Sequence, residues 1–267
     1  GSFRKLKELK IAGAQLSGSL PASWAGMVSL NVLDLSHNLL TGSLQNSWSV
    51  LGLLTSLVLN NNMLSGMLPA QLFNGSALSL TQVRLQNNQL SDNSPDALKH
   101  LKSAAEIDVS GNSLPWKIED LIAAIFALPH LTRMVADYNL IEGDAGSMYL
   151  YDVPQHRAVC SRSRFSLGND NLASLSLSGN FISGSLTNDL FGTGNVKCAF
   201  SLMSLLNLES NLLSGSIPPS MALVTSSQLA GNPELSNDGI SLPSFMAAGN
   251  TFSFLPDAMD GHKRSVY

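Results

Sequence analysis

The sequence predicts an α/β solenoid, a right-handed superhelix with a parallel β-sheet on its concave face and loops, short strands and short helices on its convex face. First, one apolar pattern recurs: the units that start at residues 6, 30, 54, 80 and 104 are 24, 24, 26 and 24 residues apart. Such a period is typical of stacked repeats. Second, each unit contains leucines that alternate with period two, as in a strand with one buried face. Third, 44% of the 267 residues are apolar and 13% charged, which suits a large core.

The repeated pattern is Leu-x-x-Leu-x-Leu-x-x-Asn-x-Leu, with Ile, Val, Met or Ala at some leucine positions. Ala14 takes the place of the Asn in the first unit. Two weaker units follow the regular ones, the first with Leu229 and Asn232, the second from Leu242 to Phe252. We therefore expect a single domain over 1–267, with about ten repeats from residue 6 to 255 and a C-terminal tail at 256–267. The regular units begin at Leu6, Leu30, Leu54, Leu80, Ala104, Leu131, Leu172 and Met203.

Each unit predicts one short strand with its leucines inward and variable residues outward. A single strand cannot bury its own apolar face, so the units must stack, at about 4.8 Å per strand, into one parallel sheet over a shared core. The repeated Asn falls where the chain leaves the strand, and its amide can bond backbone groups that would otherwise be buried without partners. These Asn residues are therefore expected to be structural.

Several units continue beyond the Asn in a more specific way, as in Leu16-Ser17-Gly18-Ser19-Leu20-Pro21 and Leu213-Ser214-Gly215-Ser216-Ile217-Pro218. Related stretches start at Leu40, Leu64 and Ile182. This continuation resembles the plant-specific class of leucine-rich repeats, found in plant receptor-kinase ectodomains and polygalacturonase-inhibiting proteins, and it is similar to repeats of protist surface antigens. The resemblance implies a second short strand in these units. Units in the middle depart from it, and residues 118–128 predict a helix on the convex side.

The resemblance also implies a non-catalytic recognition module outside the cell or at its surface, as part of a larger secreted or membrane-anchored protein. A protein or peptide is the expected ligand, and a glycan is a second class. Membrane contact is expected only through segments missing from this chain. Two other functions stay open: a structural subunit of a larger complex, and an inhibitor of an extracellular enzyme.

Other function classes lack their sequence signals. The net charge of −4 gives no basic stripe of the kind that binds nucleic acid. The five histidines fall in different repeats without metal-ligand spacing, and the sequence has no phosphate-binding glycine loop and no Gly-x-Ser-x-Gly elbow. We therefore expect no catalysis, no cofactor and no metal.

The outward residues of the predicted strands are polar, and charged side chains gather in three successive repeats. Arg and Tyr are common anchors of binding surfaces, so this group is the first candidate binding site. The alternative interpretation is a solvated face on which opposite charges pair across strands. The group consists of Arg84, Glu106, Asp108, Arg133, Asp137 and Tyr138.

The second candidate is an insertion near 142–170. The unit that begins at Leu131 is 41 residues long (172 − 131), about 17 more than the usual 24. Long excursions from a rigid scaffold often carry function. This one is locally basic, with His156, Arg157, Arg162 and Arg164.

Two covalent features are also expected. Cys160 lies in the insertion and Cys198 in a smaller excursion of the next unit, so the two can form a disulfide; two buried free thiols are the alternative. Asn74-Gly75-Ser76 is a glycosylation sequon, expected in a turn and used if the protein is a secreted glycoprotein.

Overall fold

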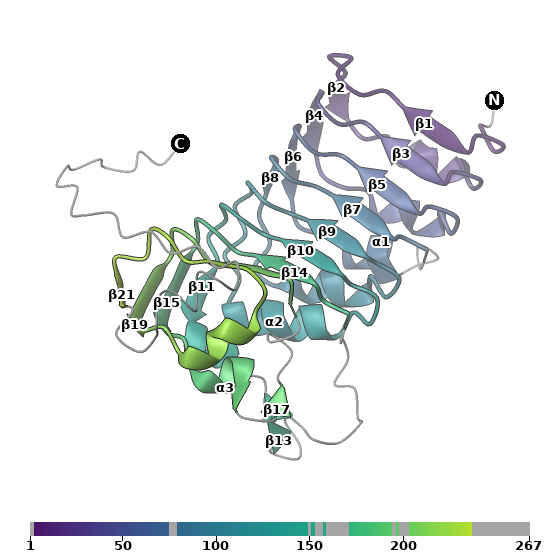
Figure 1. The fold of residues 1–267 in the computed structure, drawn as a ribbon. Helices are drawn as coiled ribbons and strands as arrows, with labels where there is room; N and C mark the ends of the chain where they lie inside the picture. Colours follow the sequence, from purple (N-terminus) through teal and green to yellow (C-terminus); the bar gives the residue numbers. More distant parts are fainter. Residues whose placement is uncertain are drawn as a thin grey trace, which may run out of the picture.

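The computed structural model describes residues 3–74, 79–148, 151–152, 157–158, 171–193, 196–197 and 203–236. The chain winds through successive turns, and Figure 1 shows the strands stacked in sequence order along the length of the molecule. The α/β solenoid predicted from the repeat is confirmed.

The concave face is one parallel sheet of nine strands, one from each turn. The middle residue of most strands points into the core: Leu57, Val83 and Ile107 are fully buried. The weak unit with Leu229 and Asn232 also contributes a strand, at the end of the sheet. In order, the strands are β1 (Glu8–Lys10), β3 (Val32–Asp34), β5 (Ser56–Val58), β7 (Gln82–Arg84), β9 (Glu106–Asp108), β10 (Arg133–Val135), β14 (Ser174–Ser176), β18 (Leu205–Asn207) and β20 (Ser227–Gln228).

A second row of strands includes the Leu-Ser/Thr-Gly stretches and is divided into two sheets of four strands. The division falls in the fifth repeat, where Leu114-Pro115 leads into a helix and Pro115 has no N–H to donate to a strand. Only an isolated bridge between Lys117 and Glu142 is formed there. The first sheet contains β2 (Ser17–Ser19), β4 (Leu39–Gly42), β6 (Met63–Gly66) and β8 (Gln89–Leu90); the second contains β11 (Glu142–Asp144), β15 (Phe181–Ser185), β19 (Leu212–Ser216) and β21 (Glu234–Ser236).

Short helices close the convex side. Trp24 and Trp48 stack there, with ring centroids 6.0 Å apart, and Nε1 of Trp48 donates to the Pro21 carbonyl. The predicted helix at 118–128 is present as α2. The helices are η1 (Ala22–Gly26), η2 (Asn46–Val50), α1 (Ala70–Asn74), η3 (Pro95–His100), α2 (Ile118–Phe126), η4 (Ala145–Met148), α3 (Asn188–Phe191) and η6 (Pro219–Leu223). Those from η1 to η4 pack successively against one another, and α3 packs against η6.

The repeated asparagines join each turn to the turn before it. Oδ1 of Asn62 accepts from the Leu40 N–H at 3.0 Å, and Nδ2 donates to the Leu35 and Leu59 carbonyls at 3.0 Å each. Their structural role is therefore confirmed. Ala14 takes this position in the first described turn, and its N–H donates to Oδ1 of Asn38 at 3.0 Å.

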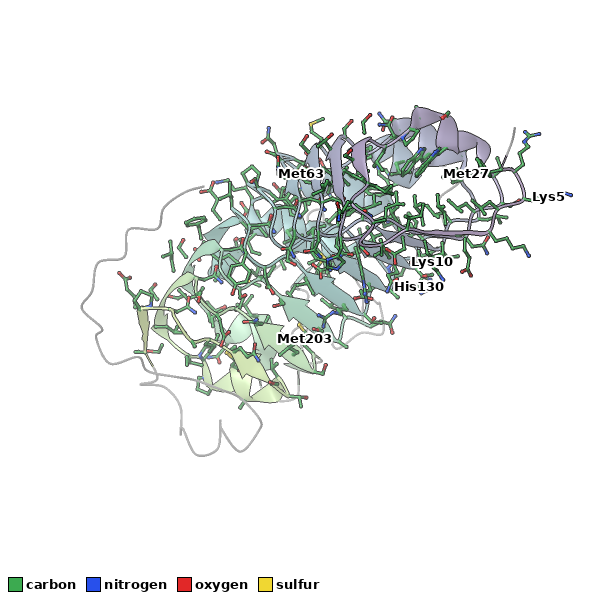
Figure 2. All side chains as sticks on the ribbon, turned by 90° about the horizontal axis from the view of Figure 1, so that it is seen from above. Lys5, Lys10, Met27, Met63, His130 and Met203 are labelled. Carbon is green, nitrogen blue, oxygen red and sulfur yellow. The ribbon has the colours of Figure 1, made fainter. Side chains whose placement is uncertain are left out.

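The core between these sides is continuous along the solenoid. Figure 2 shows Met27 and Met203 toward its two ends, where both side chains are buried, and Met63 on one edge, where 39% of it is exposed.

The inserted residues begin later than the sequence suggests. Strand β11 pairs in parallel with β15, and Ala145 and Met148 are buried in the core. Residues 142–148 therefore belong to the repeat scaffold, which moves the start of the insertion beyond Met148. Among its described residues, β12 (Tyr151–Asp152) and β13 (Arg157–Ala158) form an antiparallel pair. In the next unit, β16 (Gly192–Thr193) and β17 (Val196–Lys197) do the same.

Candidate functional site

The candidate site lies on the concave face, where β7, β9 and β10 are adjacent. Their register aligns Gln82 with Glu106 and Arg133, and Arg84 with Asp108. Residues aligned in this way on a parallel sheet are one strand spacing apart, about 4.8 Å. The helices lie across the core from this face (Figure 1), so these outward side chains meet solvent rather than another described layer.

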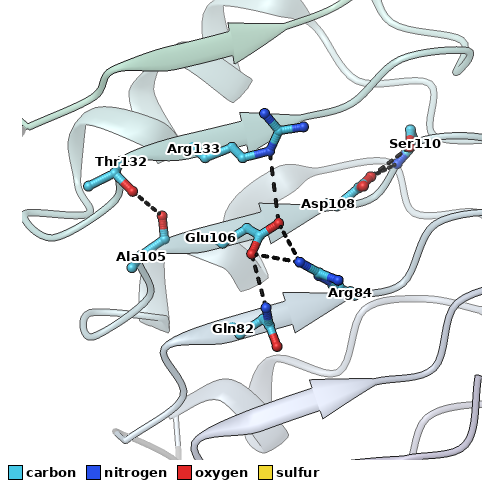
Figure 3. Close-up of polar contacts among 8 residues, drawn as sticks. All are labelled: Gln82, Arg84, Ala105, Glu106, Asp108, Ser110, Thr132 and Arg133. Atoms are coloured by element: carbon cyan, nitrogen blue, oxygen red, sulfur yellow. Dashed lines mark hydrogen bonds and ion pairs between the residues drawn. The ribbon is translucent and has the colours of Figure 1, made fainter.

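Glu106 organises the first half of the site (Figure 3). Its carboxylate accepts from Nη2 of Arg84 at 3.2 Å through both oxygens and from Nε2 of Gln82 at 3.0 Å. Nε of Arg133 lies 3.8 Å from Oε1 on the other side. Burial alone would raise the pKa of Glu106, but the hydrogen bonds and the two arginine charges outweigh it and hold this pKa below its usual value.

The two arginines are therefore not equivalent. Arg84 is committed to Glu106 by two hydrogen bonds, as the cross-strand pairing interpretation predicts. Arg133 forms only the longer contact, and 49% of its side chain is exposed. Both guanidinium groups keep donors for a ligand, and Arg133, which forms no hydrogen bond with Glu106, keeps more of them.

Asp108 and Asp137 form the second half of the site and have no cation as partner among the described residues. Oδ1 of Asp108 accepts from the N–H and the hydroxyl of Ser110. The carboxylate of Asp137 reaches the next turn, where it accepts from the Ser176 hydroxyl at 2.7 Å and the Ser178 N–H at 2.7 Å. Burial raises the pKa of Asp137 above its usual value, against these hydrogen bonds, and the nearby charge of Asp108 raises it further.

Tyr138 follows Asp137 and is the most exposed aromatic residue of the described chain, at 68%. Its backbone has φ +51°, a left-handed conformation that is rare for a bulky residue, and its N–H donates to the Ser178 carbonyl. The ring lies over Gly179, where a Cβ would be 2.5 Å from Cδ1 of the tyrosine. Glycine at 179 therefore leaves the space in which the ring rests.

The structure brings the six predicted residues into two neighbouring groups, one around Glu106 and one around Asp137. The other predicted sites are not described in the same detail. His156, Arg162, Arg164, Cys160 and Cys198 lie outside the described residues, and Arg157 is described only as part of β13. Asn74 is the last residue of α1, and the rest of its sequon, Gly75-Ser76, lies outside the described residues.

Two features of this face were missed by sequence reasoning. Ser174, on the concave side of β14 beside Arg133, is only 9% exposed, and its hydroxyl has no hydrogen-bond partner in the structure. The residues that follow the repeated Asn form an exposed apolar row over three successive turns, Leu140, Phe181 and Leu212. Aligning the repeats by that position would have revealed the row.

Within the described ranges, no helix is long and apolar enough to span a membrane. No group of three or more His, Cys, Asp or Glu side chains in those same ranges is arranged to hold a metal ion.

The family model described as Leucine Rich Repeat matches residues 29–51 and 79–101. A comparison with curated protein sequences gives no match. Solved structures match over most of the chain. The ectodomain of the Arabidopsis receptor kinase HAESA, in complex with an IDA peptide hormone ligand, gives a TM-score of 0.65 at 25% identity, over 89% of this chain and 35% of that one.

Two further structures show the range of similar proteins. The plant peptide hormone receptor RGFR1, in complex with RGF2, gives a TM-score of 0.58 at 22% identity, over 88% of this chain and 43% of that one. A plant ice-binding protein gives a TM-score of 0.62 at 25% identity, over 88% of this chain and 69% of that one. The chain thus spans less than half the length of either receptor. The chain contains leucine-rich repeats, and its solenoid resembles those of plant receptor ectodomains.

Proposed function

We propose that this chain is a non-catalytic recognition module that binds a peptide or an extended protein segment outside the cell, on the concave face between β7 and β14. The observation that carries the proposal is that this face holds charged groups whose opposite charges or hydrogen-bond partners are not supplied by the described residues. Asp108 and Asp137 have no cationic partner among the described residues, and the exposed guanidinium of Arg133 keeps free donors. Such groups on a rigid sheet are available to a ligand without any rearrangement of the scaffold.

The comparisons support the same class of function. HAESA and RGFR1 are both described in complex with peptide ligands, and their ectodomains share the solenoid over most of this chain. For this chain, peptide binding and an extracellular location are inferences from that similarity together with the concave surface. A glycan ligand stays a prediction from the sequence alone.

The proposal can be tested by panning a phage library of random 12-residue peptides against the immobilised folded chain. The expected result is a set of peptides that bind the chain, and that bind the double variant Arg84→Ala/Arg133→Ala about tenfold more weakly, as expected for loss of a charge-assisted contact.

The matched control is Lys99→Ala/Lys117→Ala. It removes the same charge from the convex side, where each lysine also pairs with a carboxylate. Peptide binding that is weakened equally by both double variants, or that neither changes, would rule out the concave face as the binding surface.

One observation favours a second function, permanent assembly into a larger complex. Leu140, Phe181 and Leu212 are 40–49% exposed and lie in three successive turns, and contiguous exposed apolar surface is typical of protein interfaces. Replacing all three with Ser tests this. If assembly is the function, the variant is more soluble than the natural chain and loses its partner; if recognition is the function, concave-face peptides bind it unchanged.

A further inference from the structure

The second half of the concave site combines negative charge with an exposed aromatic ring. Asp137 lies between Asp108 on one turn and Ser176 on the next, and Tyr138 adjoins it with 68% of its surface exposed. A tyrosine ring attracts a cation to its face, and nearby carboxylates strengthen the attraction by direct pairing. Guanidinium and ammonium groups are the chemical groups that meet both requirements.

We propose that the corner formed by Asp108, Asp137 and Tyr138 binds a basic side chain, arginine or lysine, of a peptide ligand. This inference rests on the proposed function and names the chemistry of the ligand at one end of the site. The basic group stacks against the open surface of Tyr138 and donates to the free lone pairs of Asp137 and Asp108. It thereby supplies the positive charge that no described residue gives these two carboxylates.

In the first half of the concave site, by contrast, a carboxylate is paired with positive charge. Glu106 is surrounded by Arg84, Arg133 and Gln82. Asp137, one turn further along, is more deeply buried and accepts hydrogen bonds only from uncharged groups, Ser176 and Ser178. A partly buried carboxylate without a counter-charge is unfavourable, because desolvation of its charge is not offset. A basic ligand group supplies the missing counter-charge at Asp137. Glu106 already has its counter-charge from the two arginines.

A second, independent feature indicates where the rest of the peptide lies. The Ser174 hydroxyl is more than nine-tenths buried and has no partner, although buried polar groups nearly always have one. It lies on the same side of β14 as Ser176, beside Arg133. A backbone carbonyl of the peptide accepts from the Ser174 hydroxyl and from the Arg133 guanidinium. Position 137 is four steps beyond position 133, so about 13 Å of extended chain separates this contact from the basic side chain.

The conformation of residue 138 fits this role. Most of its counterparts in other turns are small or polar, such as Asn61, Asn87 and Gly111. At 138 a large ring occupies the same left-handed position, and glycines at 111 and 179 flank it on the adjacent turns. With no side chain on either neighbour, the ring is accessible to a group of the size of a guanidinium.

The test uses the peptides that the random library yields against the natural chain. We expect them to be enriched in Arg or Lys, and a synthetic copy in which the basic residue is replaced by citrulline, the uncharged analogue of arginine, to bind about tenfold or more weakly. Tyr138→Ala is expected to weaken binding of the unmodified peptide about fivefold to thirtyfold. Asp137→Asn is expected to weaken it similarly.

Each variant has a matched control. Phe3→Ala removes an aromatic side chain of almost equal exposure, 67%, outside the site, and Asp34→Asn changes an aspartate that bonds a serine two residues on, as Asp108 does. Both controls should leave affinity unchanged. Far-UV circular dichroism and the melting temperature confirm that Tyr138→Ala and Asp137→Asn are folded.

The outcomes separate this inference from the proposed function. Peptides that need Arg84 and Arg133 but tolerate citrulline and Tyr138→Ala would overturn the inference and leave the concave recognition surface standing. A selection in which no peptide depends on the concave face would overturn both. Peptides weakened by citrulline, Tyr138→Ala and Asp137→Asn, but by neither control, support both.

Discussion

The asparagine ladder predicts a large loss of stability when Asn180 is replaced by Ala. Asn180 is 1% exposed, and its Oδ1 accepts from the backbone N–H groups of Asn139 and Ile141 at 3.2 and 3.1 Å. Its Nδ2 donates to the Ala136 and Leu177 carbonyls. Alanine leaves two N–H groups buried without a partner, at about 1–3 kcal/mol each, so the free energy of unfolding should fall by about 2–6 kcal/mol.

The same substitution near the N-terminus provides the comparison. Asn38 makes equivalent bonds to Ala14 and Leu16, but Ala14 is exposed and Leu16 only partly buried, so water can replace the lost amide. Asn38→Ala should therefore cost only about 1 kcal/mol, the net value of a hydrogen bond that water can replace.

Urea denaturation followed by circular dichroism measures both variants, with fits that allow for stepwise unfolding of the repeats. Equal losses for the two variants, or a loss below about 1 kcal/mol for Asn180→Ala, would show that the buried amide bonds do not hold the turns together.

Three further predictions concern the concave site. Gly179→Ala should destabilise the fold by about 1–3 kcal/mol, because it combines a left-handed backbone with a clash against the Tyr138 ring, and adding Tyr138→Ala should recover part of the loss in a double-mutant cycle. Because the pKa of Asp137 is raised in the folded state, its ionisation opposes folding, so Asp137→Asn should stabilise the protein increasingly as pH rises through and above the usual carboxyl range, as measured by urea unfolding from pH 3 to 7. Because the pKa of Glu106 is lowered, its stabilising effect exists above the usual glutamate pKa and is lost as pH falls through the folded value; Glu106→Gln should therefore destabilise the protein at pH 7 and have no effect at the lowest pH at which it stays folded.

The repeat pattern alone predicts the concave sheet, because a strand with alternating leucines can bury them only by stacking on the next turn. It also explains the division of the second row of strands, since Pro115 cannot continue a strand there. The six candidate residues follow from the same alignment, because outward positions of neighbouring turns must be neighbours in space.

Side-chain pairing within the site did not follow from the sequence. The pattern places Arg133 directly opposite Glu106 and Arg84 diagonally from it, yet only Arg84 forms hydrogen bonds with Glu106, because the direction of each guanidinium depends on all its neighbours at once. Asp137 and Ser176 are 39 residues apart across the insertion, which conceals their contact until the turns are stacked. The exposed ring of Tyr138 likewise depends on the absence of a side chain at Gly179.

The most direct test of the concave recognition surface is to locate a bound peptide by photo-cross-linking. The tightest peptide from the library carries a benzophenone amino acid at each position in turn, and mass spectrometry of digests identifies the residues it reaches. We expect cross-links within 82–84, 106–110, 133–138 and 174–178, with those nearest the basic residue at 137–138. Cross-links that instead concentrate on the convex helices, at 95–100 or 118–126, would contradict a concave recognition surface.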